Sequence, residues 1–478
     1  MPRLSVAFAL GKVQAELDFV DVDLSTDNEL FVDPFALAEA SDRWSQECHR
    51  TIVTFFQRIL NDIRDGRLDD ARELLSRLHE PNETRLGFSE REPQGAGIGN
   101  EQATQLFDAL QGSTAVQTGF INSLEECELM IPGIGEDKIS DLTTNIIRGN
   151  LLSYTQQQCE LHGITRHNVP LPPTFDADAM IWREGYVNAP VWRGKPILLV
   201  PKAAVRFRPA YQHRKYYRHF VLEYLRAQEL NANSRLVRTL KKTGERRVYT
   251  NALVAKYPLS KQFLYEFSRD HPDILQRYRE YLRREERVDR LSDVDPADEP
   301  VLAEALAEAL VAIQRGGEHA SAYHRAMIGI IEFVFFPQLL HPRKEAEIHD
   351  GRKRIDILTE NGAHEGIFYR LHAIRRLPCS YVAFECKNYS TEVANPEIDQ
   401  LSGRFGVNRG KVGFLCCRHF ENRALFVQRC RDTLRDDRGL ILPLDDVTVL
   451  RLLETIQQGR RQDLETELSL LVDEVWIP

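Results

Sequence analysis

The stretch Tyr381–Lys387, with the sequence Tyr-Val-Ala-Phe-Glu-Cys-Lys, constrains the fold of this chain more than any other. Its aromatic and β-branched residues are typical of a strand inside a sheet. Side chains alternate between the two faces of a strand, so Glu385 and Lys387 share one face, while Phe384 and Cys386 take the other. The sheet that contains this strand is therefore expected to hold an acid and a base side by side.

A second charged strand is predicted upstream of this stretch. Asp350-Gly351 favours the two-residue turn of a β-hairpin, because both positions tolerate positive φ. The flanking segments 345–349 and 352–358 would be the paired strands, with Arg354 and Asp356 on one face of the second strand. Asp356 can then lie close to the acid and the lysine of the following strand.

An Asp on one strand and Glu-x-Lys on its neighbour suit the metal-dependent hydrolysis of phosphodiester bonds. Carboxylates are preferred ligands of Mg²⁺, and a bound metal lowers the pKa of a water and offsets charge in the transition state. Lys387 has the chemistry to orient or deprotonate the attacking water. The alternative is an exposed strand whose charges form cross-strand pairs, each worth only a few tenths of a kcal/mol.

The surrounding segments have a regular order. A helix is predicted over residues 321–336; Glu332 is the one acid in its apolar half, and Pro337 ends it. A second helix begins at Asn395, with Pro396 in its first turn. Residues 411–417 form another apolar, strand-like run. The expected order is helix, three strands, helix and strand.

In this order and with these residues, the segment 321–418 resembles the core of the PD-(D/E)XK nuclease superfamily, which has a restriction-endonuclease-like fold. The resemblance implies that Asp356 and Glu385 bind Mg²⁺ or Mn²⁺ and that Lys387 is the catalytic lysine. It also implies that Glu332 completes the metal shell or holds a second ion.

Two further positions define how far this resemblance extends. Gln400 matches a glutamine that some branches carry on the helix after the motif, where it would contact water or phosphate. Ile355 stands where the family name has Pro, and an insertion separates the second and third strands. The resemblance covers about a fifth of the chain.

A length of 478 residues predicts more than one domain. We expect a mostly helical α+β region over residues 1–190, with a sensing or scaffold role, and a basic region over 191–290. An acidic, proline-containing linker over 291–300 would precede an α/β nuclease-like domain over 301–478, with a mixed central sheet flanked by helices.

The basic region 191–290 combines many Lys and Arg residues with interspersed tyrosines, including Tyr211, Tyr216 and Tyr217. This composition suits contact with nucleic acid, because arginine binds phosphates bidentately and aromatic rings stack on bases. The alternatives are a solvated basic face or a face that docks on an acidic neighbour. The expected nucleic-acid contacts are Arg214, Lys215, Arg218, Lys241 and Lys242, together with Arg354, Arg375 and Arg376 near the metal site.

Two glycine-rich turns, 95–99 and 132–135, each precede a predicted helix. Free N–H groups at a helix N-terminus can bind an anion, and the second turn resembles half of a helix-hairpin-helix. Neither turn has the Gly-Lys-Ser/Thr ending of a P-loop, and a tight turn with a helix cap explains both more simply.

Composition bounds the location and the partners. The net charge of −9 argues against a protein that coats nucleic acid constitutively. Eight cysteines without a C-x-x-C pair indicate a reducing compartment. No apolar run approaches the roughly 20 residues of a membrane helix, and the N-terminal apolar run is too short for a signal peptide. We therefore expect a cytoplasmic protein with no membrane contact.

Together these features predict an Mg²⁺-dependent nuclease that acts on nucleic acid, with DNA preferred. Paired cuts in a duplex are most simply made by two active sites, which favours a homodimer or larger homo-oligomer. By analogy with bacterial restriction and anti-phage defence proteins, we expect a sensing N-terminal region and a defence-system partner. The alternatives are a non-catalytic nucleic-acid-binding or regulatory subunit with the same fold, and an RNase, since the sequence does not separate DNA from RNA.

Overall fold

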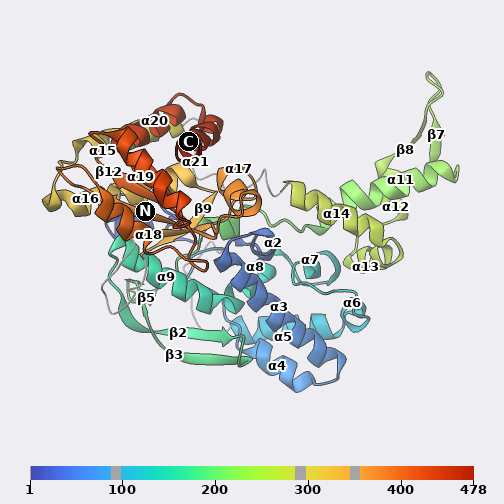
Figure 1. The fold of residues 1–478 in the computed structure, drawn as a ribbon. Helices are drawn as coiled ribbons and strands as arrows, with labels where there is room; N and C mark the ends of the chain where they lie inside the picture. The colour runs from blue at the N-terminus through green and yellow to red at the C-terminus, as the bar shows by residue number, and fades with distance from the viewer. Residues whose placement is uncertain (1, 88–97, 286–297, 345–355, 478) are drawn as a thin grey trace.

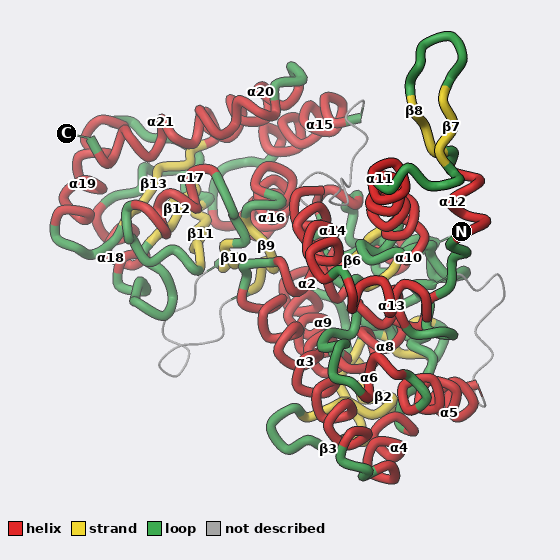
Figure 2. The backbone as a smooth tube through the Cα atoms, turned by 90° about the vertical axis from the view of Figure 1, so that its right-hand side faces the viewer, coloured by secondary structure: helices red, strands yellow, loops and turns green. Residues whose placement is uncertain are grey.

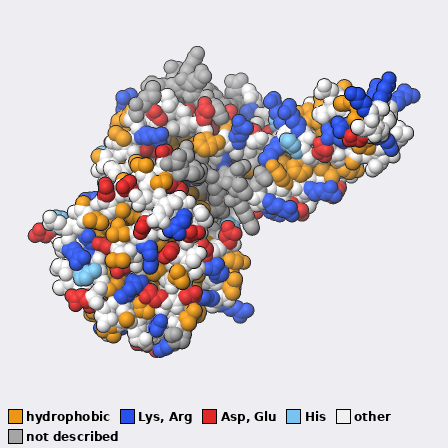
Figure 3. Space-filling view, turned by 90° about the horizontal axis from the view of Figure 1, so that it is seen from above, with side chains coloured by type: hydrophobic (Ala, Val, Ile, Leu, Met, Phe, Trp, Pro, Cys, Tyr) orange, Lys and Arg blue, Asp and Glu red, His pale blue; other side chains and the backbone are white. Residues whose placement is uncertain are grey.

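The computed structural model describes residues 2–87, 98–285, 298–344 and 356–477. It is a mixed α/β structure in which helices predominate. Figure 1 shows a body formed by the described residues of 2–212 and 298–477, from which a lobe that includes α11 to α14 and the β7–β8 hairpin projects. Seen from above, this lobe stands clear of the body (Figure 3).

The N-terminal part of the body is helical, and α3 (Arg43–Arg64) is its longest helix. Apolar residues at helical spacing, including Ile52, Phe55 and Ile59, are buried, so one stripe of α3 faces the core. The apolar periodicity of the sequence predicts an amphipathic helix near Arg43 to Arg64, and α3 has these bounds. The remaining helices of this part are α1 (Leu4–Ala7), α2 (Pro34–Glu39), α4 (Leu68–Ser76), α5 (Ile98–Gln111), α6 (Thr114–Gln117), α7 (Glu126–Met130), α8 (Glu136–Ile146) and α9 (Arg148–His162).

Short strands accompany these helices. The longest pair is the antiparallel ribbon of β2 (His167–Asp176) and β3 (Ile181–Ala189), which lies along the lower side of the body in Figure 1. Two small pairs, both antiparallel, complete the set: β1 (Phe31–Val32) with β6 (Val205–Arg206), and β4 (Val191–Trp192) with β5 (Lys195–Pro196).

The projecting lobe continues the hydrophobic cluster of the N-terminal part, which runs from Leu4 to Leu282. Buried aromatic residues such as Tyr216 and Tyr278 pack its helices together, with ring centroids 5.0 Å apart. Its elements are α10 (His213–Tyr216), the π-helical turn Tyr217–Val221, α11 (Leu222–Asn231), β7 (Val237–Thr239), β8 (Arg246–Val248), α12 (Thr250–Lys256), α13 (Lys261–Asp270) and α14 (Pro272–Glu285).

The C-terminal part is built around a five-stranded mixed sheet with the order β13-β12-β11-β10-β9. β10 is antiparallel to both β9 and β11, whereas β11, β12 and β13 are parallel to one another. Every residue of β12 and β13 is buried, so both faces of this half of the sheet are covered. The strands are β9 (Leu339–Arg343), β10 (Ile357–Asn361), β11 (Tyr381–Lys387), β12 (Val412–Cys417) and β13 (Leu440–Asp445).

Helices surround this sheet and form a second hydrophobic cluster with it (Figure 2). In this cluster the rings of Phe384 on β11 and Phe414 on β12 stack with centroids 4.9 Å apart. The helices are α15 (Glu299–Ala312), α16 (Ala320–Phe335), α17 (Gly366–Tyr369), α18 (Asn395–Ser402), α19 (Arg423–Arg435), α20 (Asp446–Gln457) and α21 (Leu464–Trp476).

The order α16, β9, β10, β11, α18, β12 follows the expected order of helix, three strands, helix and strand. The positions of the first two strands differ from the prediction. β9 ends at Arg343, and Asp356 lies immediately before β10 rather than within a strand. The predicted strand at 345–349 and the turn at Asp350-Gly351 lie outside the described residues. β9 and β10 are each buried except at their last residue.

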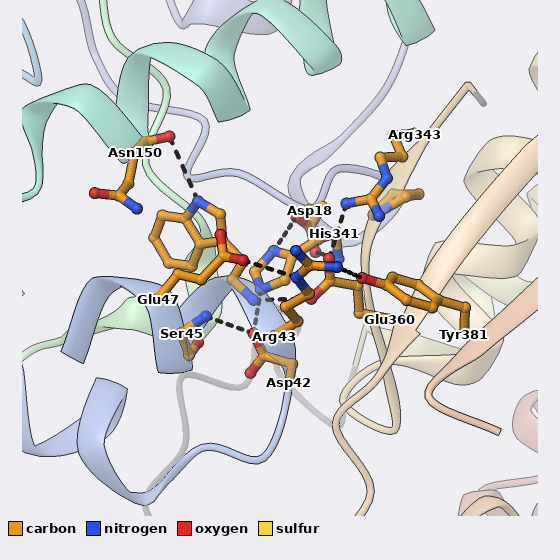
Figure 4. Close-up of polar contacts among 12 residues, drawn as sticks. Asp18, Asp42, Arg43, Ser45, Glu47, Asn150, His341, Arg343, Glu360 and Tyr381 are labelled. Atoms are coloured by element: carbon orange, nitrogen blue, oxygen red, sulfur yellow. Dashed lines mark hydrogen bonds and ion pairs between the residues drawn. The ribbon is translucent and has the colours of Figure 1, made fainter. Parts of the chain in front are cut away.

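A buried histidine joins this sheet to the N-terminal part of the body (Figure 4). His341 on β9 lies between two carboxylates, with its Nδ1 3.2 Å from Asp18 Oδ2 and its Nε2 3.1 Å from Asp42 Oδ1. Its backbone N–H also donates to Asp18 Oδ1, and the Tyr154 hydroxyl donates to Asp18 Oδ2. Burial would lower the pKa of His341, but the two carboxylates outweigh this effect and raise it well above 6.5.

A second set of contacts crosses the same boundary. The carboxylate of Glu360 on β10 accepts from the Trp44 backbone N–H at 2.9 Å and from Arg343 Nη1 at 2.8 Å. Arg43 Nη1 donates to the Tyr381 hydroxyl at the start of β11, at 3.4 Å. The start of α3 is thereby bonded to three adjacent strands, so the N-terminal part directly supports the sheet (Figure 4).

Among the described residues, none of the helices combines the length and the apolar character that crossing a membrane requires.

Candidate active site

The structure brings Asp356, Glu385 and Lys387 together at one edge of the C-terminal sheet. β11 ends with Glu385 and Lys387, and β10 runs antiparallel to it with Ile357 opposite Phe384. Continuing this register by one residue places Asp356 beside Glu385. The Cys386 backbone N–H donates to Asp356 Oδ2 at 2.8 Å, which fixes that carboxylate against the end of β11.

Glu385 is the most buried of the three residues, with 1% of its surface exposed. Its Oε1 accepts from Lys387 Nζ at 2.7 Å, and its Oε2 pairs with Arg404 Nη1. Burial raises the pKa of Glu385 and the neighbouring charge of Asp356 raises it further, while Lys387 and Arg404 act in the opposite direction. Two carboxylates that repel one another are suited to a shared cation.

The lysine is held in its charged form. Burial would lower the pKa of Lys387, but the ion pair with Glu385 outweighs this effect and raises it. A protonated lysine beside two carboxylates is placed to orient a water or to offset negative charge on a phosphate.

The donor set fits Mg²⁺ or Mn²⁺ in its chemistry. Mg²⁺ keeps several waters and is commonly bound by one or two carboxylates, and Asp356 and Glu385 supply two. Within the described residues no group of three or more Asp, Glu, His or Cys side chains is placed to hold a metal ion. Waters and substrate oxygens could complete the coordination of an ion held by these two carboxylates.

Arg404 is a site residue that the sequence prediction missed. The prediction named Gln400 on α18, but Gln400 is half-buried and its side chain makes no hydrogen bond within the described part of the chain. Arg404 follows the end of the same helix, one helical turn after Gln400, and pairs with Glu385. The sequence indicated Arg404 only through its spacing, four residues after the predicted Gln400.

Glu332 is placed in an ion pair with Lys202. It is 3% exposed on α16, and its Oε1 lies 3.0 Å from Lys202 Nζ. Lys202 is itself buried and lies over the Phe336 ring, 4.0 Å from its centroid. This pair joins α16 to the N-terminal part of the body, which the sequence did not indicate. A metal-binding role for Glu332 stays a prediction.

Residues on α16 and just after β12 make hydrogen bonds that hold the site residues in place. His324 on α16 has its Nε2 3.3 Å from the Asp356 carbonyl oxygen. Arg418, just after β12, donates to Asn388 Oδ1 at 2.8 Å and to Asp446 Oδ2 at 2.7 Å. Asn388 follows directly on Lys387, so these bonds hold the ends of β11 and β12 in place.

The arginines predicted near the site have separate environments. Arg375 donates to Asp473 at 3.2 Å and lies over the Trp476 ring, so it is bound to α21. Arg376 is exposed, in a left-handed conformation with φ of 54°. Arg354 lies outside the described residues.

The basic region is divided rather than continuous. Lys202 and Arg206 lie in the basic region predicted from the sequence, but both are buried in the body. Arg214, Lys215 and Arg218 lie at the start of the lobe, where Lys215 Nζ is 4.8 Å from the Tyr281 ring centroid and Arg214 lines a cavity of about 960 Å³. Lys241 and Lys242 are exposed at the tip of the β7–β8 hairpin.

The expected stacking of bases on the tyrosines is corrected by the structure. Tyr211, Tyr216 and Tyr217 are all buried, because their rings pack the core of the lobe. These rings present no face to a base. These three tyrosines are therefore unavailable for stacking on bases, although Phe207 and Tyr249 elsewhere in the basic region are exposed.

The glycine-rich turn at 132–135 precedes α8, as expected, and its glycines line the same cavity as Arg214. The acids Glu136 and Asp137 in the first turn of α8 also line it, which disfavours an anion there. Of the turn at 95–99, residues 95–97 lie outside the described residues.

Comparison with known proteins gives one partial match. A family described as a domain of unknown function, DUF8370, matches residues 9–212, which end immediately before α10. No curated protein and no solved structure matches the chain. The residues of the candidate active site lie outside the matched segment, so their assignment rests on the chemistry and geometry of the sheet edge.

Proposed function

We propose that this protein is a metal-dependent nuclease with Asp356, Glu385 and Lys387 as its active site. The observation that carries the proposal is the meeting of these side chains at one edge of a mixed five-stranded sheet. The strand order and the preceding helix α16 support a restriction-endonuclease-like fold for this part of the chain.

Each residue of the proposed site has a distinct role in the reaction. A divalent cation held by Asp356 and Glu385 would supply a water of lowered pKa and neutralise charge on the phosphate. Lys387 orients the attacking water and offsets the negative charge that develops on the phosphate oxygens. Arg404 positions Glu385 through their ion pair. The Cys386 backbone N–H positions Asp356 in the same way.

One observation favours a second candidate function. Glu385 is already paired with two cations, Lys387 and Arg404, and such a buried network can be purely structural. The protein would then be a nucleic-acid-binding or regulatory subunit that keeps the nuclease fold. The two candidates differ in whether the site turns over substrate.

DNA is the proposed substrate, and a homodimer would provide two sites for cutting both strands. A role in restriction or anti-phage defence remains an analogy with other proteins of the proposed fold. Light scattering of the purified full chain measures the assembly directly.

The experiment is a cleavage assay with supercoiled plasmid, linear duplex, single-stranded DNA and RNA, each with Mg²⁺ or Mn²⁺. The active-site variants are Lys387→Ala and Asp356→Ala. Lys411→Ala and Asp437→Ala are matched controls, because these residues form an ion pair near the starts of β12 and β13, at the opposite end of the sheet.

Cleavage by the wild type and both controls, but by neither active-site variant in folded form, is the expected result. Preference for RNA would identify an RNase. Cleavage that survives both active-site substitutions would place the active site elsewhere. Metal-dependent binding without cleavage of any substrate would favour the regulatory subunit.

A further inference from the structure

The β7–β8 hairpin is the most isolated element of the structure. It leaves the lobe after α11 and returns to α12, and Figures 1 and 2 show it standing free of the other elements. Its strands pair antiparallel, with Arg238 opposite Arg247 and Thr239 opposite Arg246. At the tip, the Leu240 N–H donates to the Glu245 carbonyl at 2.8 Å, which closes the turn. The hairpin is therefore an ordered two-stranded arm.

This arm, defined as residues 235–247, has a charge opposite to that of the protein. It contains six cations and one acid, which gives a net charge of +5 in a chain whose total is −9. The rest of the chain therefore carries −14. Figure 3 shows Lys and Arg side chains gathered at the far end of the projecting lobe. The cations are Arg235, Arg238, Lys241, Lys242, Arg246 and Arg247, and the acid is Glu245.

The side chains of most of these cations have no polar partner among the described residues. The side chains of Arg235, Arg238, Lys241 and Lys242 make no hydrogen bond or ion pair with any described residue, and all four residues are exposed. The remaining two have partners. Arg247 forms a bidentate pair with Glu245, with both distances 2.8 Å, and Arg246 donates to the Leu230 carbonyl at 2.6 Å.

The cross-strand arrangement is unfavourable for the isolated arm. Arg238 lies directly opposite Arg247, and like charges at directly opposed positions destabilise a strand pair. The single acid of the arm, Glu245, already forms an ion pair with Arg247. A bound polyanion would relieve this repulsion.

The chemistry of the arm favours nucleic acid over a protein partner. Protein interfaces have a core that is depleted of charged residues and enriched in aromatic residues. The arm exposes no large hydrophobic side chain between Arg235 and Arg247. Nucleic-acid affinity comes mainly from Lys and Arg contacts to phosphates.

Duplex is favoured over single strands for two reasons. Binding to single strands combines cations with aromatic rings that stack on bases, and the arm itself contains no aromatic residue. A two-stranded β-ribbon also fits the major groove of B-form DNA, which is about 12 Å wide.

We propose that the β7–β8 arm binds duplex DNA through phosphates along the major groove. The choice of DNA as substrate rests on the proposed function, but binding by the arm does not require catalysis. The arm holds DNA on the lobe, apart from the sheet edge that carries Asp356 and Glu385.

The test is the affinity of the full chain for a fluorescent duplex, measured by anisotropy over a salt series in EDTA so that no cleavage occurs. The arm variant is Lys241→Glu/Lys242→Glu. The control is Arg277→Glu/Arg284→Glu, which makes the same charge change at two exposed positions of α14 in the same lobe. Lys241→Arg/Lys242→Arg retains the charge.

The arm variant is expected to lose at least about tenfold in affinity, and the slope of log affinity against log salt should fall by about 2. The control should change affinity by less than about twofold, and the Arg variant should bind as the wild type. Equal losses in the arm variant and the control, or no loss in the arm variant, would overturn the proposal. So would a loss confined to single-stranded DNA or RNA.

The two proposals fail in different ways. Arm-dependent binding without any cleavage would refute the proposed nuclease activity and support DNA binding by the arm. Cleavage that depends on Lys387, with binding that is unaffected in the arm variant, would refute DNA binding by the arm and support the proposed nuclease activity.

Discussion

The buried His341 gives the sharpest prediction about stability. In the variant His341→Ala, Asp18 and Asp42 lose the cation that lies between them. Removing one partner of a buried ion pair costs about 3–5 kcal/mol, because the remaining charge is left uncompensated. We expect the free energy of unfolding at pH 6 to fall by this amount.

The pH dependence follows from the directions of the pKa shifts. The pKa of His341 is raised well above 6.5 in the folded chain. Below pH 6.5 the folded and unfolded chains both carry the proton, so the stabilisation is fully present. Above it the unfolded chain loses the proton first, and the free energy of unfolding falls by up to about 1.4 kcal/mol per pH unit, until the pH passes the folded pKa.

Asp18 and Asp42 make the free energy of unfolding depend on pH in the acidic range. Burial would raise the pKa values of Asp18 and Asp42, but the charge of His341 outweighs this effect and lowers both below 3.8. Their contribution is therefore present above about pH 4 and is lost as the pH falls through the folded values. The cluster stabilises the protein most between these limits.

The assay is urea unfolding followed by tryptophan fluorescence between pH 5 and 9. Trp44 is a local probe, since its ring centroid lies 5.0 Å from that of His341. The difference between wild type and variant should be largest near pH 6 and should shrink as the pH rises. His167→Ala, at an exposed position on β2, should stay within about 0.5 kcal/mol. A difference below about 1 kcal/mol that is independent of pH would refute the reasoning.

Three further predictions concern the sheet and its edge. Mn²⁺ at about 100 times its dissociation constant should stabilise the wild type by about 2.7 kcal/mol in a thermal scan, and the Asp356→Asn/Glu385→Gln variant should show no such gain; equal stabilisation of both would place the metal elsewhere. Gly410→Ala should cost about 2–4 kcal/mol, because a Cβ at this position, with φ of 85°, collides with the Tyr381 carbonyl oxygen; Gly459→Ala, with φ of 70° and open space around it, should cost only about 1–2 kcal/mol, and equal losses would contradict the collision. Lys202→Met should cost about 3–5 kcal/mol by leaving Glu332 buried without this partner, and adding Glu332→Gln should recover much of that loss; urea unfolding that shows no recovery would mean that the pair is not the source of the loss.

The elements that carry local signals were predictable from the sequence. β11 has the predicted bounds, because its run of apolar residues fits a strand buried on both faces. The helices α3 and α16 also lie where apolar periodicity and Pro337 placed them. Asp356 was placed beside Glu385 correctly, although it lies immediately before β10 rather than within a strand.

The contacts between distant segments were not predictable. Asp18 and His341 are 323 positions apart, and neither has a sequence neighbour that indicates the other. Lys202 belongs to a stretch of many cations, for which the sequence left open contact with nucleic acid, a solvated face or docking on an acidic neighbour. Tertiary packing pairs Lys202 with Glu332, which the composition could not single out. Arg404 was missed for a similar reason, because a helix pattern gives the face of a side chain but not the partner that this face meets.

The most direct test of the central claim is the rate of duplex DNA cleavage with Mg²⁺ by the wild type and by Lys387→Ala. Loss of one donor that stabilises negative charge in the transition state costs about 10²–10³-fold in rate. We predict a loss of at least about 100-fold for Lys387→Ala, with Lys411→Ala within about twofold of the wild type. Equal rates for the wild type and Lys387→Ala, with both proteins folded, would contradict the assignment of this sheet edge as the active site.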